Sequence, residues 1–240
     1  GTMNLIESSI AYDVEKFVLV SSDKAVRPSN IMGASKRLAE MGIQAYSSEE
    51  CKTIFAMVRF GNVIDSSGSV LPIFRQQINS GGPITVTHKD ITRYFMTIPE
   101  ASQLVIQAGA LTNLTENYKT SAPLYVLDMG KPVRIYDLAK RLISLTKTTT
   151  LSSNSQKEDI EIKITGLRPG EKLHEELLIG GEVRNTKHPK IKVTNEEFLT
   201  FKELLQFKQK LENAIQENNE KLVVQLLKKT VNGFHRTSQM

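Results

Sequence analysis

The chain has 240 residues, of which 40% are hydrophobic and 24% are charged, which is an ordinary composition for a globular protein with a sizeable core. Its formal net charge of +5 is not arranged as a basic stripe with interleaved aromatic residues, which argues against a nucleic-acid partner. No apolar run approaches the ~18 residues that a membrane-spanning helix needs, so we expect no membrane segment in this chain.

The first part of the chain alternates between helical and strand patterns. Met3, Ile6 and Ile10 lie at helical spacing, whereas KFVLV and IFAMV are continuous apolar runs typical of buried parallel strands. The alternation predicts a parallel α/β sheet with flanking helices. The predicted elements are a helix over residues 1–15, a strand over 16–22, a helix over 33–49 and a strand over 53–63.

Further helices and strands are predicted along the rest of the chain. From Asn195 onward, charged amphipathic patterns predict one or two peripheral helices. The Ser- and Thr-rich stretch 147–159 is predicted to be a loop, and residues 166–178 a Pro-Gly turn that leads into a helix. The other predicted elements are helices over 69–82, 98–111 and 133–146 and strands over 83–87, 124–130 and 160–165.

The glycine-rich opening of a dinucleotide-binding fold is missing from this pattern. Such a fold begins with a strand, a Gly-rich turn and a helix that receives the pyrophosphate. Gly61 and Gly68 flank a loop at the wrong spacing, and no GxGxxG or GxxGxxG run stands between a strand and a helix. Either the chain starts in the middle of such a fold or it has a different fold.

The cysteine and histidine content constrains the compartment and the metal chemistry. Cys51 is the single cysteine, so the chain has no internal disulfide, and a reducing cytoplasm is the expected location. The four histidines are scattered without ligand spacing. We therefore predict no metal site.

A cluster of reactive side chains follows the strand KFVLV. Ser21, Ser22, Asp23 and Lys24 come at its carboxyl end, which is where open α/β sheets bind ligands. Together they offer a hydrogen-bonding hydroxyl, a general acid and a general base. A helix-capping cluster on a surface loop is the alternative that these residues alone leave open.

Several weaker signals lie further along the chain. Met32 and Lys36 are one helical turn apart and share a face, but a thioether cannot exchange a proton. Asn62 follows a strand and Arg93 precedes a helix. GLRPGEKL places Arg168 and Glu171 around a turn, where arginine forks fit diphosphate oxygens and a carboxylate fits ribose hydroxyls. Each motif alone is also compatible with an ordinary exposed turn.

The combination of these segments in this order resembles one enzyme family. FVLVSSDKAVRPSNIMGASKRLAE, RFGNVIDSSGSVLPIF, GGPITVTHKDITRYFMTIPEA, LYVLDMGKPVRIYDLAKRLI and GLRPGEKLHEELL are similar to the bacterial polysaccharide-biosynthesis nucleotide-sugar dehydratases, which are extended short-chain dehydrogenase/reductases. The resemblance is strongest to the large membrane-anchored branch of UDP-N-acetylglucosamine 4,6-dehydratases, in which methionine replaces the usual tyrosine. It covers residues 1–192, and the tail after Asn195 matches no family that we can name.

The resemblance implies a reaction and a role for each site residue. Family members use tightly bound NAD or NADP to oxidise sugar C4, eliminate water across C5 and C6, and return the hydride to C6. The implied catalytic residues are Ser22 as a hydrogen-bond partner of the 4-hydroxyl, Asp23 as the acid, Lys24 as the base, Met32 as a packing residue beside the sugar, and Lys36 as the holder of the nicotinamide ribose. Ser21 and Asn62 join Lys36 in cofactor binding, and the UDP-sugar is bound by Asn62, Arg93, Arg168 and Glu171.

The resemblance also implies a domain organisation. Residues 1–71 would be the C-terminal half of an NAD(P)-binding Rossmann domain, and residues 72–194 a UDP-sugar-binding region in which 91–130 packs back on the Rossmann sheet. Residues 195–240 would form a helical tail. Since the family's membrane segment and Gly-rich half are missing, we expect a fragment that cannot bind NAD tightly or turn over alone. Whole relatives are expected to be homo-oligomers at the cytoplasmic face of the inner membrane.

Two alternatives remain open. The first is a nucleotide-sugar epimerase of the same superfamily, against which Met32 and the Ser22–Asp23–Lys24 group argue, because a 4-epimerase needs a tyrosine base and has no elimination step. The second is a module that binds a UDP-sugar without catalysis.

Overall fold

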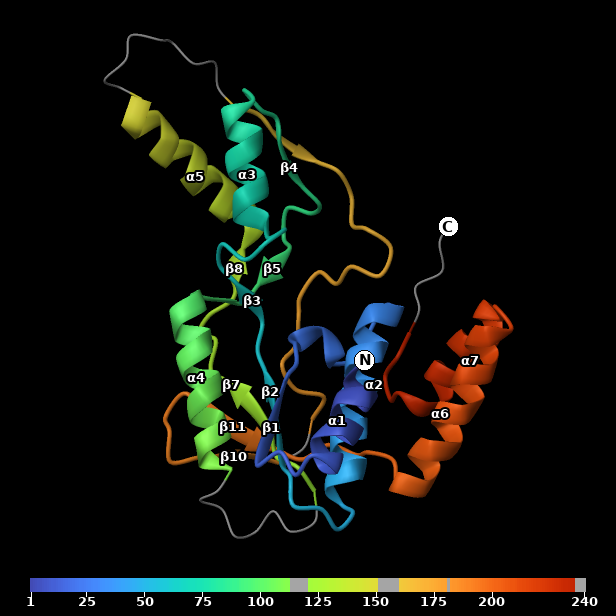
Figure 1. Cartoon of the computed structure of the whole chain (residues 1–240). Helices are drawn as coiled ribbons and strands as arrows, with labels where there is room; N and C mark the ends of the chain where they lie inside the picture. The colour runs from blue at the N-terminus through green and yellow to red at the C-terminus, as the bar shows by residue number, and fades with distance from the viewer. Residues whose placement is uncertain (113–120, 151–159, 181, 236–240) are drawn as a thin grey trace. The chain divides into compact units, whose positions relative to one another are not determined.

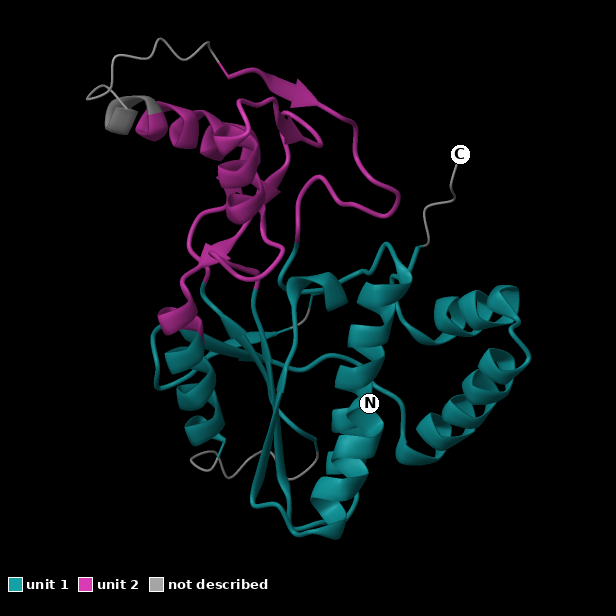
Figure 2. Ribbon diagram, turned by 45° about the horizontal axis from the view of Figure 1, so that its top comes forward, with its two compact units in different colours: residues 1–60, 102–128, 176–240 teal, residues 61–101, 129–175 magenta. Residues whose placement is uncertain are grey.

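A computed structural model of the chain describes residues 1–112, 121–150, 160–180 and 182–235. These residues form two compact units (Figures 1 and 2). Unit 1 comprises residues 1–60, 102–128 and 176–240, and unit 2 comprises residues 61–101 and 129–175. The division into functional domains at residues 71 and 194 remains a prediction. None of the helices in the described ranges is both long and apolar enough to cross a membrane.

A five-stranded sheet organises unit 1. Its order is β1-β2-β7-β11-β10, in which β1, β2 and β7 are parallel and β11 and β10 are antiparallel additions. The mixed α/β architecture with a parallel sheet and flanking helices is therefore confirmed. The strands are β1 (Lys16–Val20), β2 (Ile54–Arg59), β7 (Leu124–Leu127), β10 (Val183–Asn185) and β11 (Ile191–Thr194).

Helices cover both faces of this sheet, as Figure 1 shows. Along β1, Phe17 and Leu19 point toward the main core, and Val18 points to the opposite face, as the period of a strand requires. On that opposite face Gly109 lets α4 approach closely, because a Cβ there would lie 3.1 Å from Val18 Cγ2. The helices of unit 1 are α1 (Thr2–Ala11), α2 (Ile31–Ser47), α6 (Phe201–Gln216), α7 (Glu220–Thr230) and most of α4 (Ile98–Leu111).

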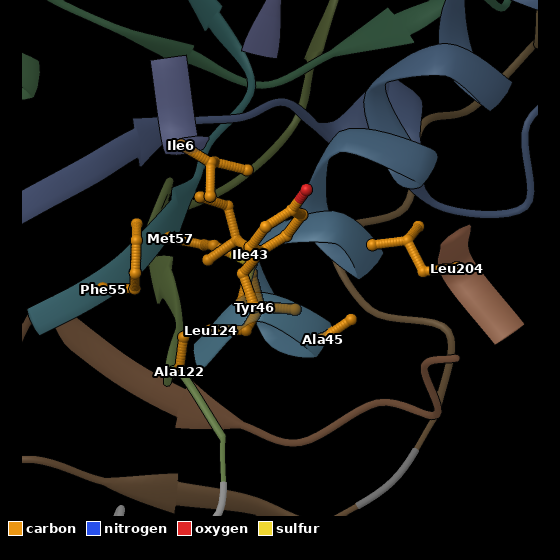
Figure 3. Packing of buried hydrophobic residues seen from close by; sticks show 9 residues of the cluster. All are labelled: Ile6, Ile43, Ala45, Tyr46, Phe55, Met57, Ala122, Leu124 and Leu204. Carbon is orange, nitrogen blue, oxygen red and sulfur yellow. The ribbon is translucent and has the colours of Figure 1, made fainter. Parts of the chain in front are cut away.

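The main core lies between the sheet and helices α1, α2 and α6. Figure 3 shows Ile6 of α1 and Tyr46 of α2 close to residues of β2 and β7. Leu204 of α6 belongs to the same cluster and is 1% exposed. Helix α6 is thus part of the main core rather than peripheral, which corrects the expectation from sequence for this helix.

Specific contacts fix the C-terminal helices in place. Thr200 and Glu203 form a capping box that starts α6. A second apolar cluster joins Phe207 of α6 and Leu227 of α7 to Ala34 of α2. The tail therefore packs directly on the helix that carries Met32 and Lys36.

Unit 2 has a separate core and three short two-stranded pairings. Its core is built from α3, β4 and α5 and includes Phe74, Ile84 and Ile135. The pairings are β3 with β6, β4 with β9, and β5 with β8. The elements of unit 2 are β3 (Asn62–Val63), α3 (Val70–Asn79), β4 (Ile84–Val86), β5 (Thr92–Arg93), β6 (Phe95–Met96), β8 (Val133–Arg134), α5 (Ile135–Thr150) and β9 (Ile162–Ile164). The short helix η1 (Asp23–Ala25) belongs to unit 1.

Three sequence predictions about local structure are wrong. The strand expected over 53–63 divides into β2 and β3. Helix α5 runs to Thr150, four residues into the expected loop, and residues 151–159 lie outside the described residues. No helix forms over 166–178, where Gly170 has a φ of +72° and the carbonyls of Leu173 and Leu177 accept hydrogen bonds from distant residues.

The packing of α6 predicts that alanine substitutions of two adjacent leucines differ strongly in their effect on stability. Leu204→Ala should lower the free energy of unfolding by about 2–5 kcal/mol, because it opens a cavity in the main core. The matched control Leu205→Ala changes a side chain that is 42% exposed, and it should cost less than about 1 kcal/mol. Urea unfolding followed by circular dichroism measures both, and equal small losses would show that α6 does not belong to the core.

Candidate active site

The turn after β1 brings a buried carboxylate together with an amine and a hydroxyl. Asp23 is 0% exposed, and its Oδ1 accepts hydrogen bonds from Ser22 Oγ at 2.9 Å and Lys24 Nζ at 2.8 Å. Its Oδ2 is also buried but has no hydrogen-bond partner in the structure. A buried oxygen of this kind is costly to leave unsatisfied, so a hydrogen-bond donor that reached it would be bound favourably. The three side chains that sequence analysis placed together are therefore in direct contact.

Helix α2 lies against this turn with little room to spare. Asn30 caps the helix by accepting a hydrogen bond from the Gly33 N–H at 2.9 Å. A Cβ at Gly33 would lie 2.4 Å from the carbonyl oxygen of Lys24, so only glycine allows this approach. Met32, which is 47% exposed, and Lys36 both lie on the exposed part of the first two turns.

A cavity of about 420 Å³ lies between α1, β1 and α2 in unit 1. Ser21 and Lys36 line it together with Leu19 and Val20. Hydroxyl and ammonium groups are suitable partners for ribose hydroxyls, and the apolar side chains suit a flat ring. The residues present therefore fit the nicotinamide nucleoside part of NAD or NADP.

A buried network of four charged side chains contacts the turn through Ser21. Glu40 of α2 accepts hydrogen bonds from Arg59 Nε at 3.0 Å and Nη2 at 2.6 Å, from Arg37 Nη1 at 3.0 Å and from Ser21 Oγ at 2.5 Å. Glu196 pairs with Arg59 at 2.8 Å and with Arg37 at 3.5 Å. Two carboxylates thus balance two guanidinium groups.

The charges of this network support one another. Burial alone raises the pKa of Glu196, but the hydrogen bonds and charge of Arg59, followed by the charge of Arg37, outweigh burial and hold the pKa below its ordinary value. Burial likewise lowers the pKa of Arg59, and the Glu40 and Glu196 carboxylates more than reverse this effect. Both groups are consequently charged at neutral pH.

A second cavity, of about 200 Å³, lies within unit 2. All four residues that sequence analysis assigned to the UDP-sugar line it, namely Asn62, Arg93, Arg168 and Glu171. Asn62 also has a buried Oδ1 without a hydrogen-bond partner in the structure. The lining therefore offers two guanidinium groups, one carboxylate and an unsatisfied amide oxygen.

Glu171 organises the polar lining of this cavity. Its Oε1 accepts hydrogen bonds from Thr87 Oγ1 at 3.2 Å and Arg93 Nη2 at 3.4 Å, and its Oε2 accepts from the Arg168 N–H at 3.0 Å. Arg93 is only 9% exposed and is also held by the carbonyl of Thr92 at 2.7 Å. These bonds fix Arg93 and the 168–171 turn before any ligand binds.

The structure thus gathers the predicted residues in two places, one in each unit. Ser21, Ser22, Asp23, Lys24 and Lys36 lie at the carboxyl end of β1 and the adjoining face of α2. Their catalytic and binding roles remain predictions. Sequence analysis missed Glu40, although two features pointed to it: it follows Lys36 by one helical turn, and the buried strand of residues 54–59 ends in a charged arginine.

The sequence is similar to known polysaccharide biosynthesis proteins. The family model "Polysaccharide biosynthesis protein" matches residues 1–196. The capsular polysaccharide biosynthesis protein CapD of Staphylococcus aureus is 57% identical over 183 residues, which cover 76% of this chain and 28% of CapD. The probable polysaccharide biosynthesis protein EpsC of Bacillus subtilis is 53% identical over 194 residues, which cover 80% of this chain and 30% of EpsC. The chain therefore spans less than a third of the length of these two relatives.

The chain is also similar to a more distant relative in sequence and to solved structures in fold. A UDP-glucose 4-epimerase of Rickettsia rickettsii is 32% identical over 185 residues, which cover 76% of this chain and 49% of that protein. Pen of Bacillus thuringiensis has a TM-score of 0.67 at 33% identity, with 83% of this chain and 57% of Pen covered. TunA, an NAD-dependent NDP-hexosamine 5,6-dehydratase from tunicamycin biosynthesis, has a TM-score of 0.54 at 17% identity, with 72% of this chain and 57% of TunA covered, and so shows the fold alone.

The lowered pKa of Glu196 predicts a specific dependence of stability on pH. A carboxyl group whose pKa is lower in the folded state stabilises the protein above its ordinary value of 4.5, and this contribution is lost as the pH falls through the folded-state pKa. Glu196→Gln should therefore lower the free energy of unfolding at pH 7, by about 3 kcal/mol or more, and weaken its dependence on pH below 4.5. Urea unfolding between pH 7 and pH 3 measures both effects. A substitution of an ordinary surface residue would change the free energy of unfolding by at most ~0.5 kcal/mol.

The matched control for this prediction is Glu197→Gln. The Glu197 side chain is exposed, and only its backbone carbonyl joins the network, through a hydrogen bond from Arg37 at 2.6 Å. This variant should keep both the stability and the pH dependence of the unsubstituted chain. If Glu196→Gln behaved in the same way, Glu196 would not be part of a stabilising network.

Proposed function

Because the chain belongs to the polysaccharide biosynthesis protein family and has the fold of the extended short-chain dehydrogenase/reductases, we propose that it carries the catalytic chemistry of a nucleotide-sugar 4,6-dehydratase. The proposed reaction converts UDP-N-acetylglucosamine to a UDP-4-keto-6-deoxy-N-acetylhexosamine for a capsule or another polysaccharide. The observation that carries this proposal is the Asp23–Lys24 pair, with its unsatisfied buried carboxylate oxygen, at the carboxyl end of β1.

The relatives support the biological setting of this proposal. CapD and EpsC are polysaccharide biosynthesis proteins by name. TunA shows that the same fold carries the dehydration of a nucleotide-linked hexosamine. The chain spans only part of the length of CapD and EpsC. The activity of a whole protein that contains this chain is therefore also a proposal.

The Ser22–Asp23–Lys24 group supplies the elements of an elimination. Once C4 of the sugar is a ketone, the proton on C5 becomes acidic. Lys24, after passing one of its own protons to Asp23 across their hydrogen bond, removes it. The C6–O bond then breaks, and Asp23 donates a proton to the departing hydroxyl, which leaves as water. Ser22 would hydrogen-bond the oxygen on C4, and Met32 would pack beside the sugar without exchanging a proton.

A nicotinamide cofactor, when bound, would supply the acceptor for the C4 hydride and later the donor to C6. Lys24 would return its proton to C5 when the hydride reaches C6. Lys36 and Ser21, which line the cavity of about 420 Å³, would hold its ribose. The Lys36 ammonium keeps this side of the turn positive. NAD and NADP are equally compatible with these residues.

The cavity of unit 2 is proposed to bind the nucleotide diphosphate. Arg93 and Arg168 would contact its oxygens, since guanidinium forks match diphosphate geometry. The Asn62 amide would contribute a hydrogen bond, to the substrate and to the cofactor as predicted from sequence. Glu171 would accept hydrogen bonds from the uridine ribose.

An epimerase is the second candidate, because the rickettsial relative carries that name. The side chain at position 32 argues against it, since a methionine cannot serve as the proton-transferring group that a 4-epimerase needs. The two reactions differ in product mass, because an epimerase isomerises its substrate and a dehydratase removes one water. A module that binds UDP-sugars without turnover is the third outcome that the experiments below distinguish.

Loss of the proposed base should abolish dehydration. The chain is incubated with UDP-N-acetylglucosamine and NAD or NADP, both alone and joined to the part of CapD that it does not match, and mass spectrometry follows loss of water. Lys24→Ala should lower the rate by about 10²–10⁴-fold, as expected for a missing general base. A product of unchanged mass would favour the epimerase, and no reaction in either form would contradict the proposed function.

Met32→Ala is the comparison variant for that experiment. Because Met32 is proposed only to pack beside the sugar, its truncation should reduce the rate much less than Lys24→Ala does. If both substitutions lowered the dehydration rate by the same factor, the packing role proposed for Met32 would be wrong.

The diphosphate site can be tested without catalysis. Arg168→Ala should weaken UDP binding by about 10- to 150-fold, which corresponds to a charged hydrogen bond of about 1.5–3 kcal/mol. Isothermal titration calorimetry measures this, with Arg141→Ala as the control, because Arg141 is an exposed arginine of α5 that does not line the cavity. Equal affinity of the two variants would remove Arg168 from the site.

A further inference from the structure

Glu40 stands next to the candidate site but has no role in the proposed reaction. It lies on α2 one helical turn after Lys36, and its side chain is completely buried. Both carboxylate oxygens are satisfied, by Arg59, Arg37 and Ser21. No oxygen of Glu40 is therefore left over for a ligand.

The hydrogen bond from Ser21 differs from the others because it leads toward the reactive group. Ser21 directly precedes Ser22, Asp23 and Lys24, and its hydroxyl donates to Glu40 Oε1 at 2.5 Å. The Glu40–Arg59 pair is made by separate hydrogen bonds that do not involve Ser21. The hydroxyl of Ser21 is thus not needed to balance the buried charges, and its effect is to connect the turn to α2.

The backbone of the same turn is fixed to a different element. The Ser21 N–H donates to the Val58 carbonyl at 2.8 Å, and the Asp23 N–H donates to the Phe60 carbonyl at 3.0 Å. These bonds hold the turn to the end of β2, and other contacts set its distance from α2. The Ser21–Glu40 hydrogen bond and the close approach at Gly33 define that distance.

We propose that Glu40 is a positioning residue, which holds the Ser22–Asp23–Lys24 turn at a fixed distance from the Lys36 face of α2 through the hydroxyl of Ser21. The positional statement stands on the structure, and its catalytic consequence rests on the proposed function. The rate of a proton transfer depends on the distance between the two groups, and a displacement of about 0.5 Å is enough to slow it. Glu40 would therefore affect the chemical step without touching the sugar.

Ser21→Ala is the variant that carries the test. Glu40→Gln also weakens the pairing of Arg59 and is expected to destabilise unit 1, whereas Ser21→Ala keeps all four buried charges and removes the connecting hydrogen bond. Ser21→Thr keeps the hydroxyl and serves as the conservative variant. Ser48→Ala is the matched control, because Ser48 is an exposed serine at the other end of α2 whose hydroxyl donates to the Ala45 carbonyl.

Amide hydrogen exchange measures whether the turn opens more often when it loses its connection to α2. The Asp23 N–H reports on the turn, and the Met57 N–H, which donates to the Pro123 carbonyl inside the sheet, reports on the stability of the whole unit. Ser21→Ala should accelerate exchange at Asp23 about tenfold relative to Met57. Ser21→Thr should restore the ratio, and Ser48→Ala should leave it unchanged. Equal acceleration at both amides, or no change at Asp23, would overturn the proposal.

A kinetic measurement separates this inference from the proposed function. Where the unsubstituted protein dehydrates UDP-N-acetylglucosamine, Ser21→Ala should lower kcat about tenfold and leave the Kd for UDP unchanged. The rates are compared at saturating NAD or NADP, so that a weaker hold on the cofactor ribose does not limit them. An unchanged kcat would overturn the catalytic consequence. If the unsubstituted protein showed no dehydration, the proposed function would fail, and the exchange ratio at Asp23 would still decide whether Glu40 positions the turn.

Discussion

Two buried carboxylates face two buried guanidinium groups at the carboxyl end of the sheet, and the balance between them constrains the arrangement of unit 1. An uncompensated charge in this interior would be strongly destabilising, so each segment that contributes a charge must arrive at the same place. Arg37 and Glu40 come from α2, Arg59 ends β2, and Glu196 precedes α6. The reactive turn follows β1 at this same place, so the same network of charges supports both the fold of unit 1 and the candidate site.

The two units meet different physical demands. In unit 1, proton transfer requires side chains within hydrogen-bond distance, and Asp23 accepts hydrogen bonds from both of its neighbours in the turn. In unit 2, the proposed recognition of a diphosphate requires positive charge held in a fixed orientation, and Glu171 holds Arg93 and the backbone of Arg168 by hydrogen bonds. Preorganisation is present in both units, and under the proposed function it would serve a reaction in unit 1 and binding in unit 2.

Much of the fold could be predicted because local patterns and tertiary structure agree. Continuous apolar runs became parallel strands, and the helix after residue 30 begins at an asparagine cap. The prediction failed where long-range contacts decide. The carbonyl of Leu173 accepts hydrogen bonds from Thr92 and Arg93, which replace the local hydrogen bonds of a helix. The main-core position of Leu204 was missed for the same reason, since helical periodicity shows that a face is apolar but not what it packs against.

The candidate site was predictable in its composition and less so in its connections. The residues of the reactive turn are adjacent in sequence, so their contact follows from the chain itself. The four residues around the cavity of unit 2 were brought together by the resemblance to a family, because their separation in sequence gives no physical indication of proximity. The sequence indicated the place of Glu40 near Lys36 and Arg59 but not its hydrogen bond to Ser21, which lies 19 residues away on another element.

The packing of the last helices on the first has a consequence for synthesis on the ribosome. Lys208 of α6 pairs with Glu7 of α1 across 201 residues of sequence, and Leu204 lies in the same core cluster as Ile6. Ile6 therefore leaves the ribosome long before Leu204, a member of the same core cluster, has been made. During that interval this part of the core is open to solvent, to chaperones and to other chains, and it closes only once α6 has been made.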